Sequence, residues 1–282
     1  MNPIVNILFI LMFLHLIMTT DAVIAETSVS EKPLMEIGAG ALYTRIYDYP
    51  GSDRELHLVI PFPVGTYRGS FLRSGRDEGL RGRLLRSESV ELGMNYDGSF
   101  SLPGRKNPDR EGMEPLQTVG ELGPAITLTL WKSSEFELSW LNGYRKAFNT
   151  NFKSVHDRGY ALGSQFHTDY TPERFNQIHF DFKFGLKYAN RSLMSYYYGV
   201  RASEVTEVRP FYEARAGLMN VFATFSVVAS VTEYLSLFSS VIVFSFHHAS
   251  NRRSPLMKRI RNDLVSVGFV YSLYQSEEKG WN

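Results

Sequence analysis

The most constraining feature of the sequence is the stretch of residues 178–188, which reads IHFDFKFGLKY. Its aromatic and aliphatic side chains all fall on one parity, and His179, Asp181, Lys183 and Lys187 fall on the other. Successive side chains of a β-strand point to opposite faces, so a strand here has one apolar and one charged face. A helix would spread both kinds of side chain around its surface. The stretch also has the roughly 9–11 residues that a tilted strand needs to cross a bilayer.

The N-terminus predicts export. An apolar run over residues 4–18 is followed by Val23-Ile24-Ala25, a small-residue pattern suited to signal peptidase, although no Lys or Arg precedes it. The run is shorter than the roughly 20 residues of a spanning helix, and an uncleaved anchor is the alternative. We therefore expect a signal peptide over residues 1–25 and one domain over residues 26–282.

The composition fits a membrane barrel. Aromatic residues make up 14% of a chain whose mean hydropathy is −0.18, as expected when every membrane strand is half polar. The mature chain would carry 30 cations against 28 acids (29 less Asp21), which indicates no nucleic acid or other polyanionic partner. The chain has no Cys, so disulfides and thiolate metal sites are excluded.

The rest of the chain reads as strand after strand, with short and long connections in alternation. The second strand ends at Pro61-Phe62-Pro63, and residues 189–209 read as irregular. Short connections are predicted near residues 63–65, 86–88, 132–134, 171–174 and 232–234, and mostly long ones near 45–54, 74–79, 99–118, 148–157, 189–214 and 248–262. This alternation is typical of outer-membrane barrels, which have short periplasmic turns and long external loops.

The predicted fold is an all-β, antiparallel, up-and-down transmembrane β-barrel of about 12 strands. Ten strands is the alternative, because residues 67–85 are poorly patterned. Residues 221–246 hold a single charge, Glu233, and could instead form one transmembrane helix. We favour two strands with Glu233 in their turn, because the segment is rich in Val, Thr, Ser and Phe and a buried glutamate costs roughly 2–3 kcal/mol.

The polar faces of the strands predict the residues that line the barrel interior. Both signs of charge are present, so these side chains either pair and block the lumen or line a narrow channel. The predicted lumen-facing residues are Glu91, Glu137, Arg145, His179, Asp181, Lys183 and Lys187.

A basic cluster in the last long loop predicts contact with lipopolysaccharide. No acid occurs from Ala249 to Asn262, and cations there could pair with phosphates of the outer leaflet; a solvated loop is the alternative. The residues of this cluster are Arg252, Arg253, Lys258, Arg259 and Arg261.

No set of residues predicts catalysis, a cofactor or a metal. His167 and Asp169 would share one strand face, but Thr168 between them would not, so a rim histidine beside a turn is the preferred interpretation. A strand would split the His247-His248 pair, and no other ligand cluster lies near it in sequence. The Gly38-x-Gly40 motif leads into no helix, and we expect its small residues to relieve crowding inside the barrel.

Several short motifs in order resemble the MltA-interacting protein family (MipA/OmpV). They are Asp48-Tyr49-Pro50-Gly51-Ser52-Asp53, Tyr67-Arg68-Gly69, Gly79-Leu80-Arg81-Gly82, Glu111-Gly112-Met113, Glu121-Leu122-Gly123-Pro124, Tyr197-Tyr198-Gly199-Val200 and Ser254-Pro255-Leu256. The chain departs from the usual pattern at its end, where a polar tail over residues 275–282 follows Tyr274.

The resemblance implies an outer-membrane barrel without an active site. It implies, as a function, a scaffold in peptidoglycan assembly that links a murein lytic transglycosylase to a bifunctional murein synthase. A narrow channel for small solutes is the alternative, and a hydrolase using His167 or another rim histidine is the minority hypothesis.

Overall fold

A computed structural model describes residues 33–68, 72–75, 79–87, 89–99, 101, 107–150 and 155–279. The predicted signal peptide lies outside these residues, as does the end of the polar tail. None of the helices in the described ranges is long and apolar enough to span a membrane.

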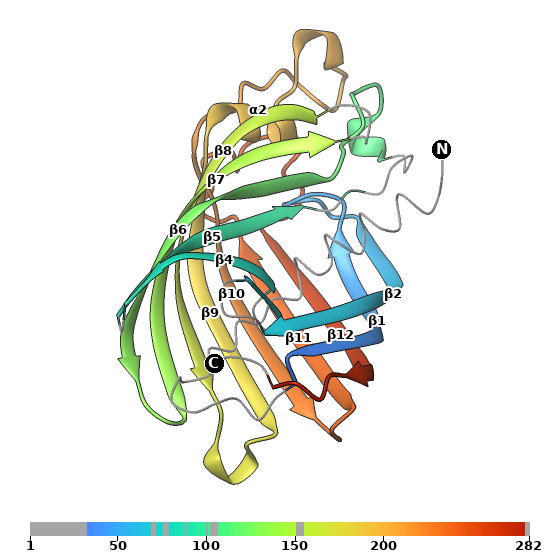
Figure 1. Cartoon of the computed structure of the whole chain (residues 1–282). Coiled ribbons are helices and arrows are strands. Elements are labelled where there is room, and N and C mark those ends of the chain that lie inside the picture. The colour runs from blue at the N-terminus through green and yellow to red at the C-terminus, as the bar shows by residue number, and fades with distance from the viewer. Residues whose placement is uncertain are drawn as a thin grey trace.

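The described residues form one antiparallel sheet that closes on itself, with each strand beside its neighbours in sequence (Figure 1). The strands are β1 (Met35–Tyr47), β2 (Glu55–Arg68), β3 (Leu72–Gly75), β4 (Gly79–Arg86), β5 (Val90–Ser99), β6 (Val119–Lys132), β7 (Phe136–Thr150), β8 (Val155–Tyr170), β9 (Ile178–Ala189), β10 (Gly217–Ser230), β11 (Leu235–Ser245) and β12 (Arg261–Gln275). The short helices are η1 (Pro108–Arg110), η2 (Glu173–Phe175), α2 (Arg191–Tyr198) and η3 (Ala202–Glu204). The predicted up-and-down transmembrane β-barrel is confirmed.

The strand count depends on two short strands. Ten strands have ten residues or more, whereas β3 has four and β4 has eight. These two complete the ring of twelve, and within the described residues β2 meets β3 at only two paired positions. They occupy the weakly patterned segment for which the sequence left ten or twelve strands open.

The barrel closes where β1 pairs with β12, from Glu36 opposite Gln275 to Arg45 opposite Val265. Glycine is needed on the inner face of β1 at this seam. A Cβ at Gly40 would lie 2.8 Å from the ring of Phe62, and one at Gly38 would lie 2.4 Å from the carbonyl oxygen of Tyr271. The small residues of this motif therefore relieve crowding, as the sequence indicated.

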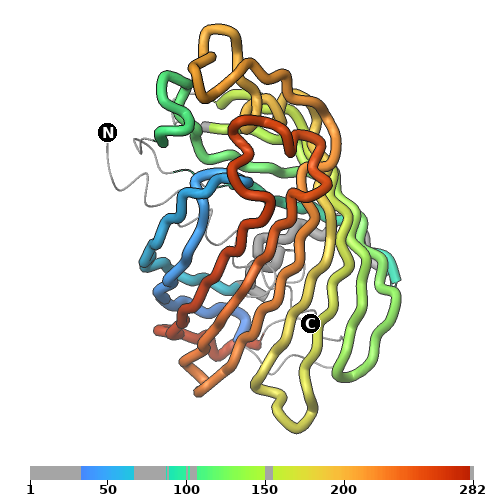
Figure 2. Tube along the Cα trace, turned by 180° about the vertical axis from the view of Figure 1, so that it is seen from behind, coloured from blue at the N-terminus to red at the C-terminus, as the bar shows by residue number. Residues whose placement is uncertain are grey.

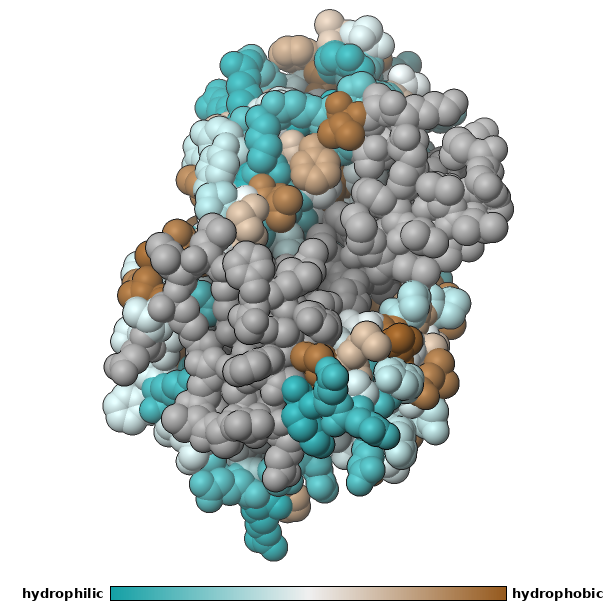
Figure 3. All heavy atoms as spheres, in the orientation of Figure 1, coloured by the Kyte–Doolittle hydropathy of each residue, from teal (hydrophilic) through white to brown (hydrophobic). Residues whose placement is uncertain are grey.

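Side chains alternate between a buried inner face and an exposed apolar outer face. On β9, Phe182, Phe184 and Leu186 are 44–50% exposed, while Asp181 and Lys187 are buried. The outer apolar residues meet lipid, which is why a chain with so many exposed aromatics can be stable. Figure 3 shows hydrophilic residues gathered at the lower end of one face, where the strands turn.

The long connections gather at one end of the barrel and the short turns at the other (Figures 1 and 2). Residues 133–135, 171–177 and 231–234 form turns at the lower end, and residues 190–216 and 246–260 form long loops at the upper end. The predicted alternation holds for these connections. β7 continues to Thr150 and β8 begins at Val155, so both strands extend into the segment 148–157 that the sequence predicts as a connection.

Two local predictions are wrong. β2 does not end at Pro61-Phe62-Pro63 but continues to Arg68, and both prolines point outward opposite Ala41 and Ala39 of β1. Proline lacks an N–H and is tolerated at a strand edge, and on this side β2 meets only the short β3. Residues 191–198, predicted to be irregular, form the helix α2, which Asn190 caps by accepting a hydrogen bond from the Leu193 N–H at 3.1 Å.

The alternative of a transmembrane helix over residues 221–246 is also wrong. This segment forms β10 and β11, paired from Val221 opposite Ser245 to Ser230 opposite Ser236. Glu233 lies in the turn between them, as the two-strand interpretation requires.

Candidate functional site: the barrel interior

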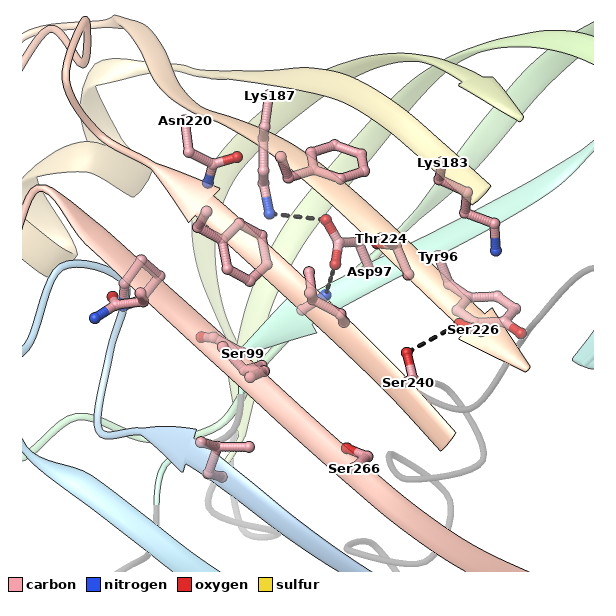
Figure 4. A pocket seen from close by; sticks show the side chains of 18 of the residues that line it. Tyr96, Asp97, Ser99, Lys183, Lys187, Asn220, Thr224, Ser226, Ser240 and Ser266 are labelled. Atoms are coloured by element: carbon pink, nitrogen blue, oxygen red, sulfur yellow. Dashed lines mark hydrogen bonds and ion pairs between the residues drawn. The ribbon is translucent and has the colours of Figure 1, made fainter. Parts of the chain in front are cut away.

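The interior holds a cavity of about 340 Å³, lined by charged residues on one side and by hydroxyl and aromatic residues on the other. In Figure 4, Lys187 and Asp97 point toward each other from β9 and β5, and Ser226, Ser240 and Ser266 come from β10, β11 and β12. Because successive side chains of a strand point to opposite faces, each strand contributes its inward-pointing residues to this space.

Two cations and two acids on four strands form what we call the upper ion network: Asp97, Glu121, Arg145 and Lys187. Arg145 donates through Nε to Glu121 Oε2 at 3.2 Å and through Nη2 to Asp97 Oδ2 at 3.2 Å. Lys187 Nζ donates to Glu121 Oε1 at 2.6 Å and to Asp97 Oδ2 at 3.0 Å. Each charge therefore has two opposite partners, and the network crosses the lumen wall from β5 to β9.

Small residues on the wall make room for the Arg145 guanidinium. A Cβ at Gly163, on the neighbouring strand β8, would lie 2.7 Å from Arg145 Nη1. The third hydrogen bond of the guanidinium goes to Asn95 Oδ1 at 3.0 Å. The position of the Arg145 side chain along the inner surface is therefore fixed by its three hydrogen-bond partners and by the space that Gly163 leaves.

An acidic row occupies the lower end of the same wall, defined by Glu137, Asp169 and Asp181. Glu137 lies opposite Asp169 in the β7–β8 register, and Asp169 lies opposite Asp181 in the β8–β9 register. His167 hydrogen-bonds Asp181 Oδ2, and Lys183 Nζ lies 3.7 Å from Asp181 Oδ1. His179 contacts Thr171 through Nδ1 and lies 4.0 Å from Asp169 Oδ1 through Nε2.

The row continues around the barrel as hydroxyl groups. Asp181 is opposite Ser226, Ser226 is opposite Ser240, and Ser240 is opposite Ser266. The hydroxyls of Ser226 and Ser240 lie 2.9 Å apart. One side of the interior is therefore ionic, and the other is uncharged, with hydroxyl groups among apolar side chains such as Phe222 and Phe238.

The upper mouth is capped by α2. Leu193, Met194, Tyr197 and Tyr198 of this helix are buried among wall residues that include Ala147, Ala161 and Ala189, whose small size leaves space for a helix. We call α2 and the loops that hold it the tyrosine cap.

Hydrogen bonds from three other loops hold the tyrosine cap in place. Tyr198 Oη donates to the Pro50 carbonyl at 3.1 Å, Arg110 Nη1 donates to the Tyr197 carbonyl at 2.9 Å, and Ser254 Oγ donates to the Tyr198 carbonyl at 2.7 Å. Burial raises the pKa of Tyr198 above its ordinary value and lowers the pKa of Arg110.

The structure places each sequence-predicted interior residue on an inward position. Glu137, Arg145, Asp181 and Lys187 are buried, and Glu91, His179 and Lys183 are partly buried on the same faces. The sequence analysis did not name Asp97, Glu121 and Asn95 as interior residues. Asn95 and Asp97 share parity with the predicted Glu91 of β5, and Glu121 shares parity with the small residues of β6.

The five basic residues of the last loop divide into two groups. Lys258 Nζ lies 3.1 Å from Asp109 Oδ1 and Arg259 Nη1 lies 3.2 Å from Glu55 Oε1, so these two are neutralised within the protein. Arg252, Arg253 and Arg261 are exposed, and Arg252 and Arg253 line an open hollow with Arg215 and Phe211. Contact of these residues with lipopolysaccharide stays a prediction.

The family model of the MltA-interacting protein MipA matches residues 37–273, which is most of the chain. The chain belongs to the MipA family. The predicted resemblance is therefore confirmed, and the chain is an outer-membrane β-barrel protein. No curated protein matches this MipA-family chain.

Solved outer-membrane proteins resemble the chain only distantly. An outer membrane channel from Pseudomonas putida F1 is 10% identical with a TM-score of 0.46, over 89% of this chain and 100% of that one. The NanC porin is 8% identical with a TM-score of 0.37, over 85% and 100%. Outer membrane phospholipase A from Escherichia coli is 11% identical with a TM-score of 0.33, over 83% and 89%. At these TM-scores the likenesses carry no conclusion about function.

Replacing Lys187 by methionine tests the upper ion network. Lys187→Met leaves Glu121 and Asp97 with one cation in place of two, and Glu121 is almost fully buried. We expect a loss of about 3 kcal/mol in the free energy of unfolding, measured by urea titration in detergent or lipid. The matched control is Lys146→Met, because Lys146 faces outward in an exposed pair with Asp157, and solvent screening should make its loss much smaller. Equal losses in the two variants would contradict a buried network.

Proposed function

We propose that this protein is a scaffold of the outer membrane that binds murein enzymes at its lower, periplasmic end. Membership of the MltA-interacting protein family is the observation that carries the proposal. The proposed partners are a murein lytic transglycosylase and a bifunctional murein synthase, and the proposed process is peptidoglycan assembly.

The interior supports a scaffold more than a wide pore. The charges of the upper ion network bind each other across the wall, and the tyrosine cap fills the mouth above them. A barrel that is braced and capped in this way provides a rigid body from which partner enzymes can be held.

The lower end provides a surface for those partners, which we call the turn platform: residues 133–135 with residues 171–177. Two backbone N–H groups of the second turn bond to Glu135, from Thr171 to its carbonyl at 2.8 Å and from Glu173 to Oε1 at 2.6 Å. Ser134 Oγ also donates to Glu173 Oε1 at 3.2 Å. Two turns held together in this way form a more rigid docking surface than either would alone.

The tip of the turn platform presents an aromatic residue that a partner could bury. Phe175 is 49% exposed, with the guanidinium of Arg174 5.6 Å from its ring centre. Exposed aromatic and arginine side chains are the residue types that most often dominate binding energy at protein interfaces.

Phe175→Ser tests the scaffold. We expect the full chain in detergent to bind the purified transglycosylase, and this variant to bind it at least about tenfold more weakly in a pull-down or biolayer assay. The control is Phe211→Ser, since Phe211 is 61% exposed but lies in the long loop at the opposite end. Absence of binding to both murein enzymes, or an equal loss in the control, would remove the proposal.

A narrow channel is the second candidate, and the cavity of about 340 Å³, whose lining includes charged and hydroxyl side chains, is the observation that favours it. Planar-bilayer recording separates the two functions. The scaffold predicts no steady conductance from the wild type, and the control, with residues 191–198 replaced by Gly and Ser, should conduct because it lacks the helix of the tyrosine cap. Steady conductance steps in the wild type would favour the channel.

A further inference from the structure

Two carboxylate oxygens of the acidic row, Glu137 Oε2 and Asp181 Oδ1, are buried without a hydrogen bond among the described residues. Three carboxylates occupy directly opposed positions on β7, β8 and β9, and like charges opposite each other destabilise a sheet. All three residues are buried, at 5–8% exposure. An ionised carboxylate that is buried requires a cation or hydrogen-bond donors.

Two lysines lie near carboxylate oxygens of the row at the outer limit of hydrogen-bonding distance or beyond it. Lys183 Nζ is 3.7 Å from Asp181 Oδ1, and Lys132 Nζ is 3.5 Å from Glu137 Oε2. Within the described residues, these same two carboxylate oxygens accept no hydrogen bond although both are buried. The row therefore has acceptor capacity that only a further cation or donor would satisfy.

His167 adds a nitrogen ligand at the same place. Its ring, Asp169 and Asp181 each offer one ligand atom, and these three atoms lie within 4.8 Å of one another. At the widest separation that this limit allows, an ion equidistant from the three atoms lies about 2.8 Å from each, so side-chain shifts of under about 1 Å reach zinc bond lengths. His167 is 5% exposed, so its position is set by packing.

We infer that His167, Asp169 and Asp181 form a binding site for a divalent first-row transition-metal ion, with Glu137 as an additional carboxylate beside it. One imidazole with carboxylates suits Zn²⁺ and its neighbours, whereas Ca²⁺ and Mg²⁺ prefer oxygen ligands alone. Binding of the ion through His167 Nε2 displaces the hydrogen bond to Asp181 and requires the ring proton to lie on Nδ1. The ion offsets two of the three carboxylate charges of the acidic row.

The site would join three strands next to the turn platform. Asp169 lies two residues before Thr171, where the second turn of the platform begins, and Glu137 lies two residues after Glu135 of the first turn. A bound ion therefore holds the lower ends of β8 and β9 in one position, with Glu137 of β7 beside it. The inference does not depend on the proposed scaffold function.

Zinc titration of the full chain tests the site. The chain is purified in detergent, stripped with EDTA, and titrated with Zn²⁺ by calorimetry, with Ca²⁺ as the comparison ion. We expect one Zn²⁺ per chain, no comparable Ca²⁺ binding, and a higher midpoint of thermal unfolding with Zn²⁺. Affinity should fall at least about tenfold in Asp169→Asn and in His167→Gln, both of which preserve side-chain size.

A second pair of histidines provides the control. His247 and His248 are exposed, with ring centres 4.8 Å apart, and could bind Zn²⁺ adventitiously. The double variant His247→Ala/His248→Ala should retain the full affinity. Absence of stoichiometric zinc binding to the wild type, or loss of binding only in this double variant, would overturn the inference, and the wild-type titration decides even if a row variant fails to fold.

Discussion

Pairing of backbone groups inside lipid is the constraint on which the rest of this structure depends. A hydrocarbon environment offers no hydrogen-bond partner, so a spanning sheet has to close and leave no edge. The pairing of β1 with β12 over residues 36–45 does this, and it brings together strands more than 200 residues apart. Glycines on the inner face of β1 permit the close contact. The prolines of β2 are tolerated because, on the side away from β1, this strand meets only the short β3.

Closure also decides what happens to the charges. Because the apolar side chains face lipid, the polar side chains of every strand point into the interior and have to be satisfied by polar side chains of other strands. The upper ion network satisfies this demand by matching two cations with two acids from four strands. In the acidic row, by contrast, one oxygen of Glu137 and one of Asp181 accept no hydrogen bond among the described residues, and this makes the lower half of the same wall the candidate ligand site.

The sequence predicts the fold well where periodicity is strong. Residues 178–188 alternate so regularly that the pattern alone assigns their two faces, and Lys187 and Asp181 lie on the face that it predicts for them. Prediction is weaker where local rules conflict: the prolines predict an early end for β2, yet an edge strand tolerates them. The pattern also does not reveal α2, because the burial of a tyrosine-rich helix depends on small wall residues far away in sequence.

The partners of each charge could not be predicted. The sequence around Lys187 does not indicate that this lysine pairs with Glu121. Parity shows only that a side chain points inward, and it does not show which other strand carries its partner. The three ligands of the proposed metal site come from two strands, and only the register between β8 and β9 brings Asp169 opposite Asp181.

Site-directed labelling tests the central claim, that β9 has one lipid face and one lumen face. The chain contains no cysteine, so a single introduced thiol is the only one present. Cysteines are placed one at a time at Phe182, Lys183, Phe184, Leu186 and Lys187 and offered a bilayer-soluble maleimide and a water-soluble one. The account predicts that the bilayer-soluble reagent reacts at 182, 184 and 186 and not at 183 and 187. Labelling without a period of two would contradict it.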